Sequence, residues 1–261
     1  MLDQLNIAGL NKVEVAIKRL QTFEPPDGYY LAFSGGKDSI VIKKLAEMAG
    51  VKFESHYQIT TVDPPELIYY MRQHHKDVIM HHPEKTMWQL IASRKMPPTR
   101  MVRYCCDELK EIGGSGRFVV TGVRWAESSR RKSSRAGLEV NAYTKDKITA
   151  DPDNPESESM ARFCPTKGKH ILNPIIDWDD AEVWEFIKTY NLPYCGLYDE
   201  GFKRIGCIGC PLSTNAKQEL ERFPKYKQAY LRAFSRMLQN IPDDKTWKTP
   251  EDVMKWWTGG K

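Results

Sequence analysis

A glycine-centred turn, Ser34-Gly35-Gly36-Lys37-Asp38-Ser39, constrains the fold of this chain more than any other feature. An apolar run, Tyr29 to Phe33, precedes the turn, and a helix-like stretch, Ile40 to Gly50, follows it. A short buried strand that turns directly into a helix is typical of α/β proteins. Two adjacent glycines also allow positive φ and leave no side chain between the main-chain amides and a ligand.

The residues of this turn suit an anion. The free amides and the positive dipole end of the following helix favour a phosphate, and Lys37 and the serines add a mobile cation and short donors. A plain strand-to-helix turn is the alternative, but it needs only one glycine and no Lys-Asp-Ser after it. The G-x-x-x-x-G-K-[ST] spacing of a Walker loop is absent. We therefore predict a phosphate cradle of another kind.

Strand-like and helix-like runs alternate along the chain, with gaps long enough for crossover helices. The predicted strands are Tyr29 to Phe33, Val51 to Gln58, Val78 to His82 and Phe118 to Val123, and regular structure resumes at His170 to Trp178. This alternation predicts the α/β class: a doubly wound (Rossmann-like) parallel sheet of about five strands, with flanking helices and a helical C-terminal tail. Ligands of such sheets bind beyond the carboxyl ends of the strands, where the glycine turn lies.

Three regions follow from the pattern. Residues 1–27 are predicted as an N-terminal helix, residues 28–211 as the α/β domain and residues 212–261 as a helical C-terminal extension. Within the domain, residues 139–169 are polar and lack an apolar period, so they are predicted as a long mobile loop. In the extension, Gln218 to Leu238 is predicted to be helical. Its tryptophans are expected to form a packing face, with a partner site as the alternative: Trp247, Trp256 and Trp257.

The bulk composition is that of a soluble globular protein. Of 261 residues, 41% are hydrophobic and 28% are charged, and no apolar run is long enough to cross a bilayer. The first residues lack the basic and apolar regions of a signal peptide, so we expect a cytoplasmic location and no membrane partner. The net charge of +5 is compatible with a polyanionic partner but does not require one.

Six cysteines in a chain without an export signal indicate metal or redox chemistry rather than a disulfide framework. The pairs Cys105-Cys106 and Cys207-x-x-Cys210 supply four thiolates, the number that a 4Fe-4S cluster needs. Adjacent side chains diverge in a strand, so the first pair can bind one cluster only where the backbone bends, as at a helix start. A four-cysteine zinc site and a set of unrelated buried thiols remain alternatives.

Several motifs, in order, resemble those of a known superfamily. The glycine turn resembles the SGGKDS pyrophosphate loop of the adenine-nucleotide α-hydrolase (PP-loop) superfamily. Cys-Cys with a later Cys-x-x-Cys resembles the cluster-bearing adenylylsulfate and phosphoadenylylsulfate (PAPS) reductases. Thr121-Gly122-Val123-Arg124 with Glu127, Ser128 and Arg131 resembles their G-x-R-x-x-[EQ]-S-x-x-R segment. The resemblance spans roughly Gly28 to Pro211 and implies membership of the PAPS reductase family.

The resemblance implies roles for individual residues. It implies catalytic roles, with Mg²⁺, for Lys37, Asp38 and Arg124. It implies a 4Fe-4S cluster on Cys105, Cys106, Cys207 and Cys210, with Lys110 beside it, because the family has a lysine four residues after its second cysteine. The nucleotide-binding residues that it implies are Ser34, Gly35, Gly36, Lys37, Asp38, Ser39, Thr61, Gly122, Arg124 and Arg131.

The resemblance breaks at the nucleophile of the thioredoxin-dependent reductases, a cysteine in a C-terminal Glu-Cys-Gly-Leu-His segment, because no cysteine follows Cys210. We therefore expect an ATP pyrophosphatase that activates an acceptor for sulfur transfer, closest in type to the DNA phosphorothioation enzyme. Its expected partners are ATP, a sulfur-donor protein such as a cysteine desulfurase, a nucleic acid acceptor and further copies of the chain. A sulfite-producing reductase that uses Cys164 or Cys195, and a non-catalytic nucleotide-binding scaffold, are the alternatives.

Overall fold

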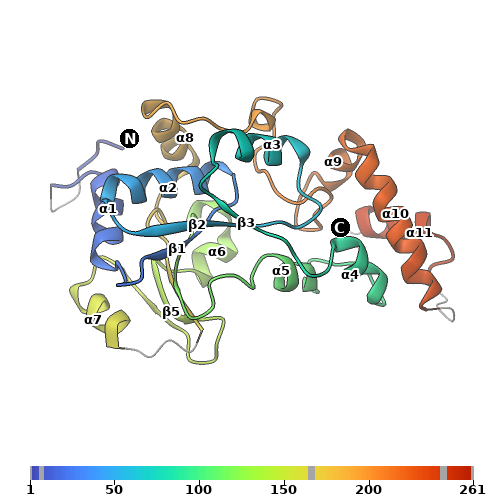
Figure 1. Cartoon of the computed structure of the whole chain (residues 1–261), viewed down its shortest axis with the longest axis horizontal. Helices are drawn as coiled ribbons and strands as arrows, with labels where there is room; N and C mark the ends of the chain where they lie inside the picture. Colours follow the sequence, from blue (N-terminus) through green and yellow to red (C-terminus); the bar gives the residue numbers. More distant parts are fainter. Residues whose placement is uncertain (1, 6–8, 164–167, 242–245, 260–261) are drawn as a thin grey trace. The chain divides into compact units, whose positions relative to one another are not determined.

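The computed structural model describes residues 2–5, 9–163, 168–241 and 246–259 (Figure 1). The chain forms two compact units. The sheet unit consists of Met1–Tyr57, Tyr69–Ile79 and Gly114–Gly201. The cysteine unit consists of Gln58–Ile68, Met80–Gly113 and Phe202–Lys261. Each unit is therefore assembled from three separate stretches of sequence.

The strands form one seven-stranded sheet of order β3-β2-β1-β4-β7-β5-β6. The strands are β1 (Tyr29–Ala32), β2 (Phe53–Gln58), β3 (Ile79–His81), β4 (Phe118–Val120), β5 (Leu138–Ala142), β6 (Ile148–Ala150) and β7 (Lys169–Leu172). β1 pairs in parallel with both β2 and β4, and β4 pairs in parallel with β7. The order reverses at β1, so the predicted doubly wound α/β class is confirmed, with a switch point between β1 and β4.

The stretch predicted as a long loop, residues 139–169, differs from that prediction. It contains most of β5, all of β6, helix α7 (Pro155–Phe163) and the start of β7. β5 pairs antiparallel with β6 and β7, and all five of its residues are buried. The polar sequence hid these strands, because a charged residue such as Glu139 can be buried when its carboxylate is paired. Arg135 Nε lies 2.6 Å and Lys147 Nζ 2.8 Å from the carboxylate oxygens of Glu139.

Helix α2 (Lys37–Ala49) packs against two other helices of the sheet unit (Figure 1). These are α1 (Lys12–Thr22) and α8 (Asp180–Thr189). A capping box between Asn11 and Glu14 begins α1. Gly50, with φ of 69°, ends α2. The sheet unit also contains the 3-10 turns η1 (Trp125–Glu127) and η2 (Gly196–Tyr198) and helix α6 (Ser129–Ser134). Helix α3 (Pro65–His74) has residues in both units.

The cysteine unit is helical. Its helices are α4 (Met87–Ser93), α5 (Tyr104–Leu109), α9 (Ala216–Arg222), α10 (Pro224–Gln239) and α11 (Pro250–Gly259). The ring of Tyr230 on α10 meets those of Trp88 and Trp257 at centroid distances of 4.9 Å and 4.7 Å. The stretch 218–238 is helical as predicted and forms two helices, because Pro224 cannot continue α9 and instead begins α10. Over the described ranges, we find no helix with the length and apolar character needed to span a membrane.

Candidate functional site

The turn between β1 and α2 has the backbone of an anion cradle. Gly35 has a φ of 70°, and Gly36 is the N-cap of α2 without a side-chain hydrogen bond to the first turn. Ser39 Oγ donates to Gly36 O at 2.8 Å, and Ser34 Oγ lies 3.3 Å from Ser39 Oγ. The serines thus brace the turn, and Gly36 as the N-cap supplies no side-chain oxygen to the first amides of the 13-residue helix.

Gly122 lets the chain after β4 pass closely against the start of α2. A Cβ atom at Gly122 would lie 3.0 Å from the backbone carbonyl carbon and oxygen of Asp38. That distance is too short for any other residue without a shift of the backbone. The close approach brings Arg124, two residues further on, beside the glycine turn.

Four charged side chains meet at this turn. Arg124 Nε donates to Asp38 Oδ1 at 2.7 Å, and Arg124 Nη2 donates to Asp180 Oδ1 at 2.6 Å. Lys37 Nζ lies 3.4 Å from Asp38 Oδ2 and 3.3 Å from Asp180 Oδ1. Lys37 and Arg124 are 5% and 1% exposed, whereas the side chain of Asp180 is 72% exposed. Two buried cations are therefore balanced by two carboxylates that reach solvent.

The pKa shifts agree with this pairing. Burial acts to lower the pKa of Arg124, but Asp38 and Asp180 outweigh it and raise that pKa overall. Burial acts to raise the pKa of Asp180, but the hydrogen bond from Arg124 and the charge of Lys37 lower it overall. Arg124 also donates through Nη1 to Trp178 O at 3.2 Å. Arg124 thus contacts both carboxylates, and its predicted contact with phosphate stays a prediction.

A tyrosine from η2 touches the same turn. The backbone N–H of Lys37 donates to Tyr198 Oη at 2.9 Å. The ring of Tyr198 packs edge-on against Trp184 of α8, with centroids 5.1 Å apart. The first amide of α2 thus has a side-chain partner from a distant part of the sequence.

Asp180 and Tyr198 were missed as site residues. Asp180 follows Asp179, the N-cap of α8, so an acid at this position is already explained by helix capping. Tyr198 was missed because a tyrosine does not by itself indicate a phosphate site. Only the packing of α8 and η2 against α2 could have revealed them.

Two other predicted nucleotide-binding residues have different surroundings. Arg131, on α6, is ion-paired with Glu127. Thr61 belongs to the cysteine unit, where its Oγ1 accepts from the backbone N–H of Met87 at 2.9 Å. Thr61 also has a φ of 64°, which is unusual for a β-branched residue. The structure therefore brings together Ser34 to Ser39, Gly122 and Arg124, and it describes Thr61 only within the other unit.

The four predicted cysteine ligands all lie in the cysteine unit, and each is half-buried. Cys105 and Cys106 occupy the first turn of α5, which is the helix start that the sequence requires. Cys207 and Cys210 flank a tight turn, closed by a hydrogen bond from Cys210 N to Cys207 O at 3.2 Å, with Gly209 at φ of 71°. The pKa of Cys210 is raised by burial first and by the neighbouring thiols Cys207 and Cys106 as well. The two pairs are thus close enough to interact.

Positive charge lies beside these thiols. The pKa of Cys106 is lowered, first because Cys105 donates a hydrogen bond to it and then by the charges of Lys110 and Arg103. The pKa of Lys110 is raised, chiefly by Cys207. Lys110 is therefore close enough to the Cys-x-x-Cys turn to offset negative charge there.

The metal that these four thiols would hold stays a prediction. Within the described ranges, no group of three or more His, Cys, Asp or Glu side chains is arranged to hold one metal ion. A cubane cluster spreads its four thiolates over four irons, so it accepts sulfurs that are farther apart than the ligands of one zinc ion. Four half-buried thiols with a nearby ammonium are compatible with that arrangement.

The remaining cysteines are the alternative nucleophiles. Cys195, in the sheet unit, is 1% exposed. Cys164 lies outside the described residues. A thiol as buried as Cys195 cannot attack a substrate without rearrangement of its surroundings.

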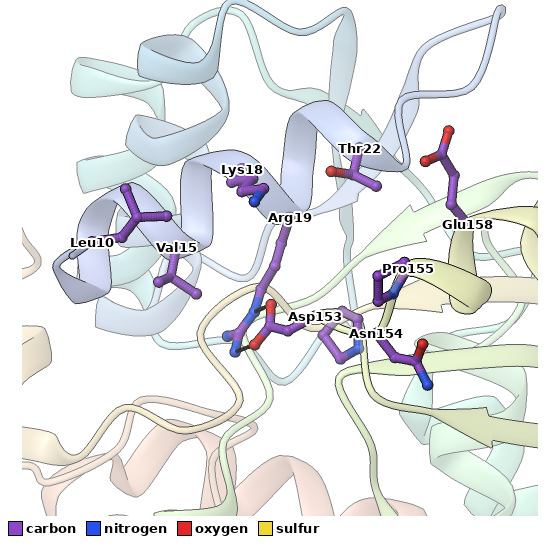
Figure 2. Close-up of a pocket in the computed structure, with 10 residues that line it drawn as sticks. Leu10, Val15, Lys18, Arg19, Thr22, Asp153, Asn154, Pro155 and Glu158 are labelled. Carbon is purple, nitrogen blue, oxygen red and sulfur yellow. Dashed lines mark hydrogen bonds and ion pairs between the residues drawn. The ribbon is translucent and has the colours of Figure 1, made fainter. Parts of the chain in front are cut away.

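A separate cavity of about 380 Å³ lies in the sheet unit between α1 and the start of α7. Figure 2 shows the side chain of Arg19 pointing to Asp153 in this cavity. Arg19 Nε and Nη2 bind the two Asp153 oxygens at 2.8 Å and 2.5 Å, and Nη1 binds Asp177 Oδ1 at 2.8 Å. Asp153 and Asp177 thus neutralise Arg19 in this cavity.

Comparison with known proteins places these features in a family. The family model for the phosphoadenosine phosphosulfate reductase domain matches residues 28–213. An uncharacterised protein of Methanocaldococcus jannaschii is 27% identical over 213 residues, which cover 78% of this chain and 45% of the relative. The adenosine 5'-phosphosulfate reductase of Neisseria meningitidis is 26% identical over 118 residues, which cover 45% of this chain and 41% of the relative. The chain thus spans less than half the length of these relatives.

A solved structure was also matched. The phosphoadenylyl-sulfate reductase of Candida auris, in a phosphate complex, is 17% identical with a TM-score of 0.48, over 77% of this chain and 90% of that chain.

Proposed function

The chain belongs to the phosphoadenosine phosphosulfate reductase family of nucleotide-binding PP-loop enzymes, and on this premise we propose that it is an ATP pyrophosphatase. In this proposal ATP binds at the glycine turn and is cleaved at its α-phosphate. The AMP group is transferred to an acceptor, where sulfur then replaces it. The proposed acceptor is a nucleic acid, as in DNA phosphorothioation, and the proposed sulfur donor is a protein such as a cysteine desulfurase.

The pair of carboxylates around Lys37 is the observation that carries this proposal. Asp38 and Asp180 lie 3.4 Å and 3.3 Å from Lys37 Nζ. Enzymes take ATP as its Mg²⁺ complex, and Mg²⁺ is usually held by one or two carboxylates together with phosphate oxygens. Asp180 is exposed enough to turn from Lys37 to a magnesium ion when a triphosphate arrives.

The proposed chemistry is a displacement at phosphorus. A non-bridging oxygen of an acceptor phosphodiester attacks the α-phosphorus of ATP, and the bond to the bridging oxygen breaks, so that the electron pair leaves with pyrophosphate. Lys37 and Mg²⁺ neutralise charge on the leaving group, and the amides of the glycine turn bind its oxygens. A sulfur nucleophile then displaces AMP from the acceptor.

We further propose that Cys105, Cys106, Cys207 and Cys210 hold a 4Fe-4S cluster, with Lys110 offsetting part of the thiolate charge. Such a cluster, when bound, supplies redox-active iron and labile sulfide. Since thiols stay reduced in the cytoplasm, we propose that location for the protein.

The surface around α6 supports a polyanionic acceptor. Arg130 and Lys132 are exposed on this helix, which follows the chain segment that carries Arg124. Exposed cations of this kind bind nucleic acid phosphates without reading their sequence.

Pyrophosphate release from ATP and Mg²⁺, with DNA or RNA present as acceptor, tests the proposal. Lys37→Ala is expected to reduce release by about 100-fold, because it removes the buried cation that faces the leaving group. Lys44→Ala is the matched control, since Lys44 lies on the same helix and pairs only at its surface with Glu47 at 3.2 Å. Absence of release with every acceptor would overturn the proposal.

The named relatives favour a second candidate, a reductase that releases sulfite from a sulfonucleotide. Sulfite production from either sulfonucleotide, abolished by Cys164→Ser or Cys195→Ser, would establish it. Tight ATP binding without turnover of either kind would instead identify a nucleotide-binding scaffold.

A further inference from the structure

Two groups that would bind a diphosphate are held in this structure by side chains of the chain itself. The backbone N–H of Lys37, at the start of α2, donates to Tyr198 Oη at 2.9 Å. The ammonium of the same residue lies 3.3 Å from Asp180 Oδ1. One neutral oxygen and one charged oxygen thus lie where phosphate oxygens would accept hydrogen bonds and neutralise the lysine.

Both partners come from one stretch of sequence. Asp180 is the first residue of α8, and Tyr198 ends η2, the next short helix. Trp184 of α8 links them, because its ring meets Tyr198 edge-on at 5.1 Å. The two oxygens therefore reach the glycine turn together.

These contacts differ from the rest of the ionic network in their exposure. Arg124 is 1% exposed and binds both carboxylates, so it forms the fixed part of the site. Asp180 has a side chain that is 72% exposed, and Tyr198 is half-buried. An entering ligand can reach Asp180 and Tyr198 without unpacking the core.

We propose that Tyr198 and Asp180 form an internal substitute for a diphosphate group, which the ligand displaces as it binds. This inference rests on the proposed nucleotide site. The substitute keeps the cradle in its binding geometry while it is empty, and it competes with the ligand. Removing either oxygen therefore raises the affinity for a diphosphate, because the ligand no longer has to displace it.

Inorganic pyrophosphate without Mg²⁺ is the probe, and its affinity is measured by calorimetry on the full chain. Tyr198→Phe and Asp180→Asn are each expected to bind about threefold to tenfold more tightly than the wild type, which is the effect of one hydrogen bond. Tyr194→Phe is the control for Tyr198, since Tyr194 packs on Trp184 at 5.2 Å but donates to Asp199. Asp199→Asn is the control for the charge change at Asp180.

Tryptophan fluorescence gives a second measurement. Pyrophosphate is expected to change the emission of the wild type, because Tyr198 moves away from Trp184, and the change is expected to vanish in Trp184→Phe. If Asp180→Asn does not fold, as judged by thermal melting, Tyr198→Phe decides the test alone.

The outcomes separate the two proposals. If the wild type binds neither pyrophosphate nor ATP, both the proposed function and this inference are wrong. If the wild type binds pyrophosphate but Tyr198→Phe binds it equally or more weakly, Tyr198 is a ligand of the phosphate or a bystander, and only this inference is overturned.

Discussion

The two units differ in how charge is balanced at their functional residues. In the sheet unit, Lys37 and Arg124 face Asp38 and Asp180, so cations and carboxylates are matched before any ligand arrives. In the cysteine unit, four thiols gather near Lys110 and Arg103, and four thiolates would exceed these two charges.

A matched site can keep its geometry when empty, whereas four gathered thiols can all become thiolates together only when a metal compensates their charge. We therefore expect the glycine turn to be preformed and the cysteine site to depend on its metal. The following predictions test that contrast.

The largest effect is expected for Cys207→Ala. Loss of one of four thiolates should abolish iron and acid-labile sulfide in anaerobically purified protein, because a cubane cluster needs four ligands. Pyrophosphate binding at the turn should persist. Cys195→Ala, at a buried cysteine outside the set, should retain the iron. Equal iron in both variants, or pyrophosphate binding lost together with iron in Cys207→Ala, would contradict the contrast.

Arg124→Ala should destabilise the sheet unit by about 3 kcal/mol, because it removes a buried cation from two carboxylates. This loss of stability is at the low end of the range for breaking a buried ion pair, since both carboxylates are partly hydrated. Urea unfolding measures it. Arg131→Ala, which removes a half-buried surface pair with Glu127, should change stability by less than about 1 kcal/mol. Equal effects of the two substitutions would show that the network at the turn is not preformed.

A buried histidine makes the sheet unit sensitive to acid. Tyr70 Oη donates to Pro193 O at 2.7 Å, so it accepts from His75 Nε2 at 2.7 Å, and His75 Nδ1 then accepts from Lys43 at 3.4 Å. Burial, followed by the charge of Lys43, lowers the pKa of His75 to about 4. The neutral ring is thus the form that the fold requires.

The free energy of unfolding should therefore fall as pH drops from about 6.5 to about 4, by at most roughly 3 kcal/mol. Stability falls with acid because His75 of the unfolded chain binds a proton near pH 6.5, whereas His75 of the folded chain binds it only near pH 4. Urea unfolding at several pH values measures the slope. His75→Gln should have a shallower slope, and an unchanged slope would assign the acid sensitivity to other groups.

The smallest effect is expected for Gly122→Ala, at about 1 to 2 kcal/mol of stability, because the added Cβ would press on the backbone of Asp38. Pyrophosphate affinity should fall as the start of α2 shifts. At Gly196 a Cβ would meet nothing within 4 Å, so Gly196→Ala is the control. Equal pyrophosphate affinity in both variants would show that the turn tolerates movement of α2.

The parallel part of the sheet could be predicted from the sequence because its strands are short apolar runs between helices. β1, for example, was predicted as Tyr29 to Phe33 and observed as Tyr29–Ala32. The β5–β6 hairpin could not be predicted in the same way. Its buried Glu139 depends on Arg135 and Lys147, and local polarity does not reveal ion pairs between strands and loops.

The candidate sites show the same limit. The glycine turn and the helix start at Cys105 are local features with local sequence signals. Asp180 and Tyr198 reach the turn through tertiary packing, over sequence separations that no local pattern spans. Arg124 lies beside the turn, but its contact with Asp180 was not foreseen, because no local pattern links these two residues.

The division of the cysteine unit into three stretches has a consequence for synthesis of the protein. Cys105 and Cys106 belong to the middle stretch, Met80–Gly113, and Cys207 and Cys210 belong to the last, Phe202–Lys261. The whole third stretch of the sheet unit, Gly114–Gly201, is translated between them. While the ribosome makes that stretch, Cys105 and Cys106 are on the nascent chain without Cys207 and Cys210, so the proposed cluster would be bound only at the end of translation.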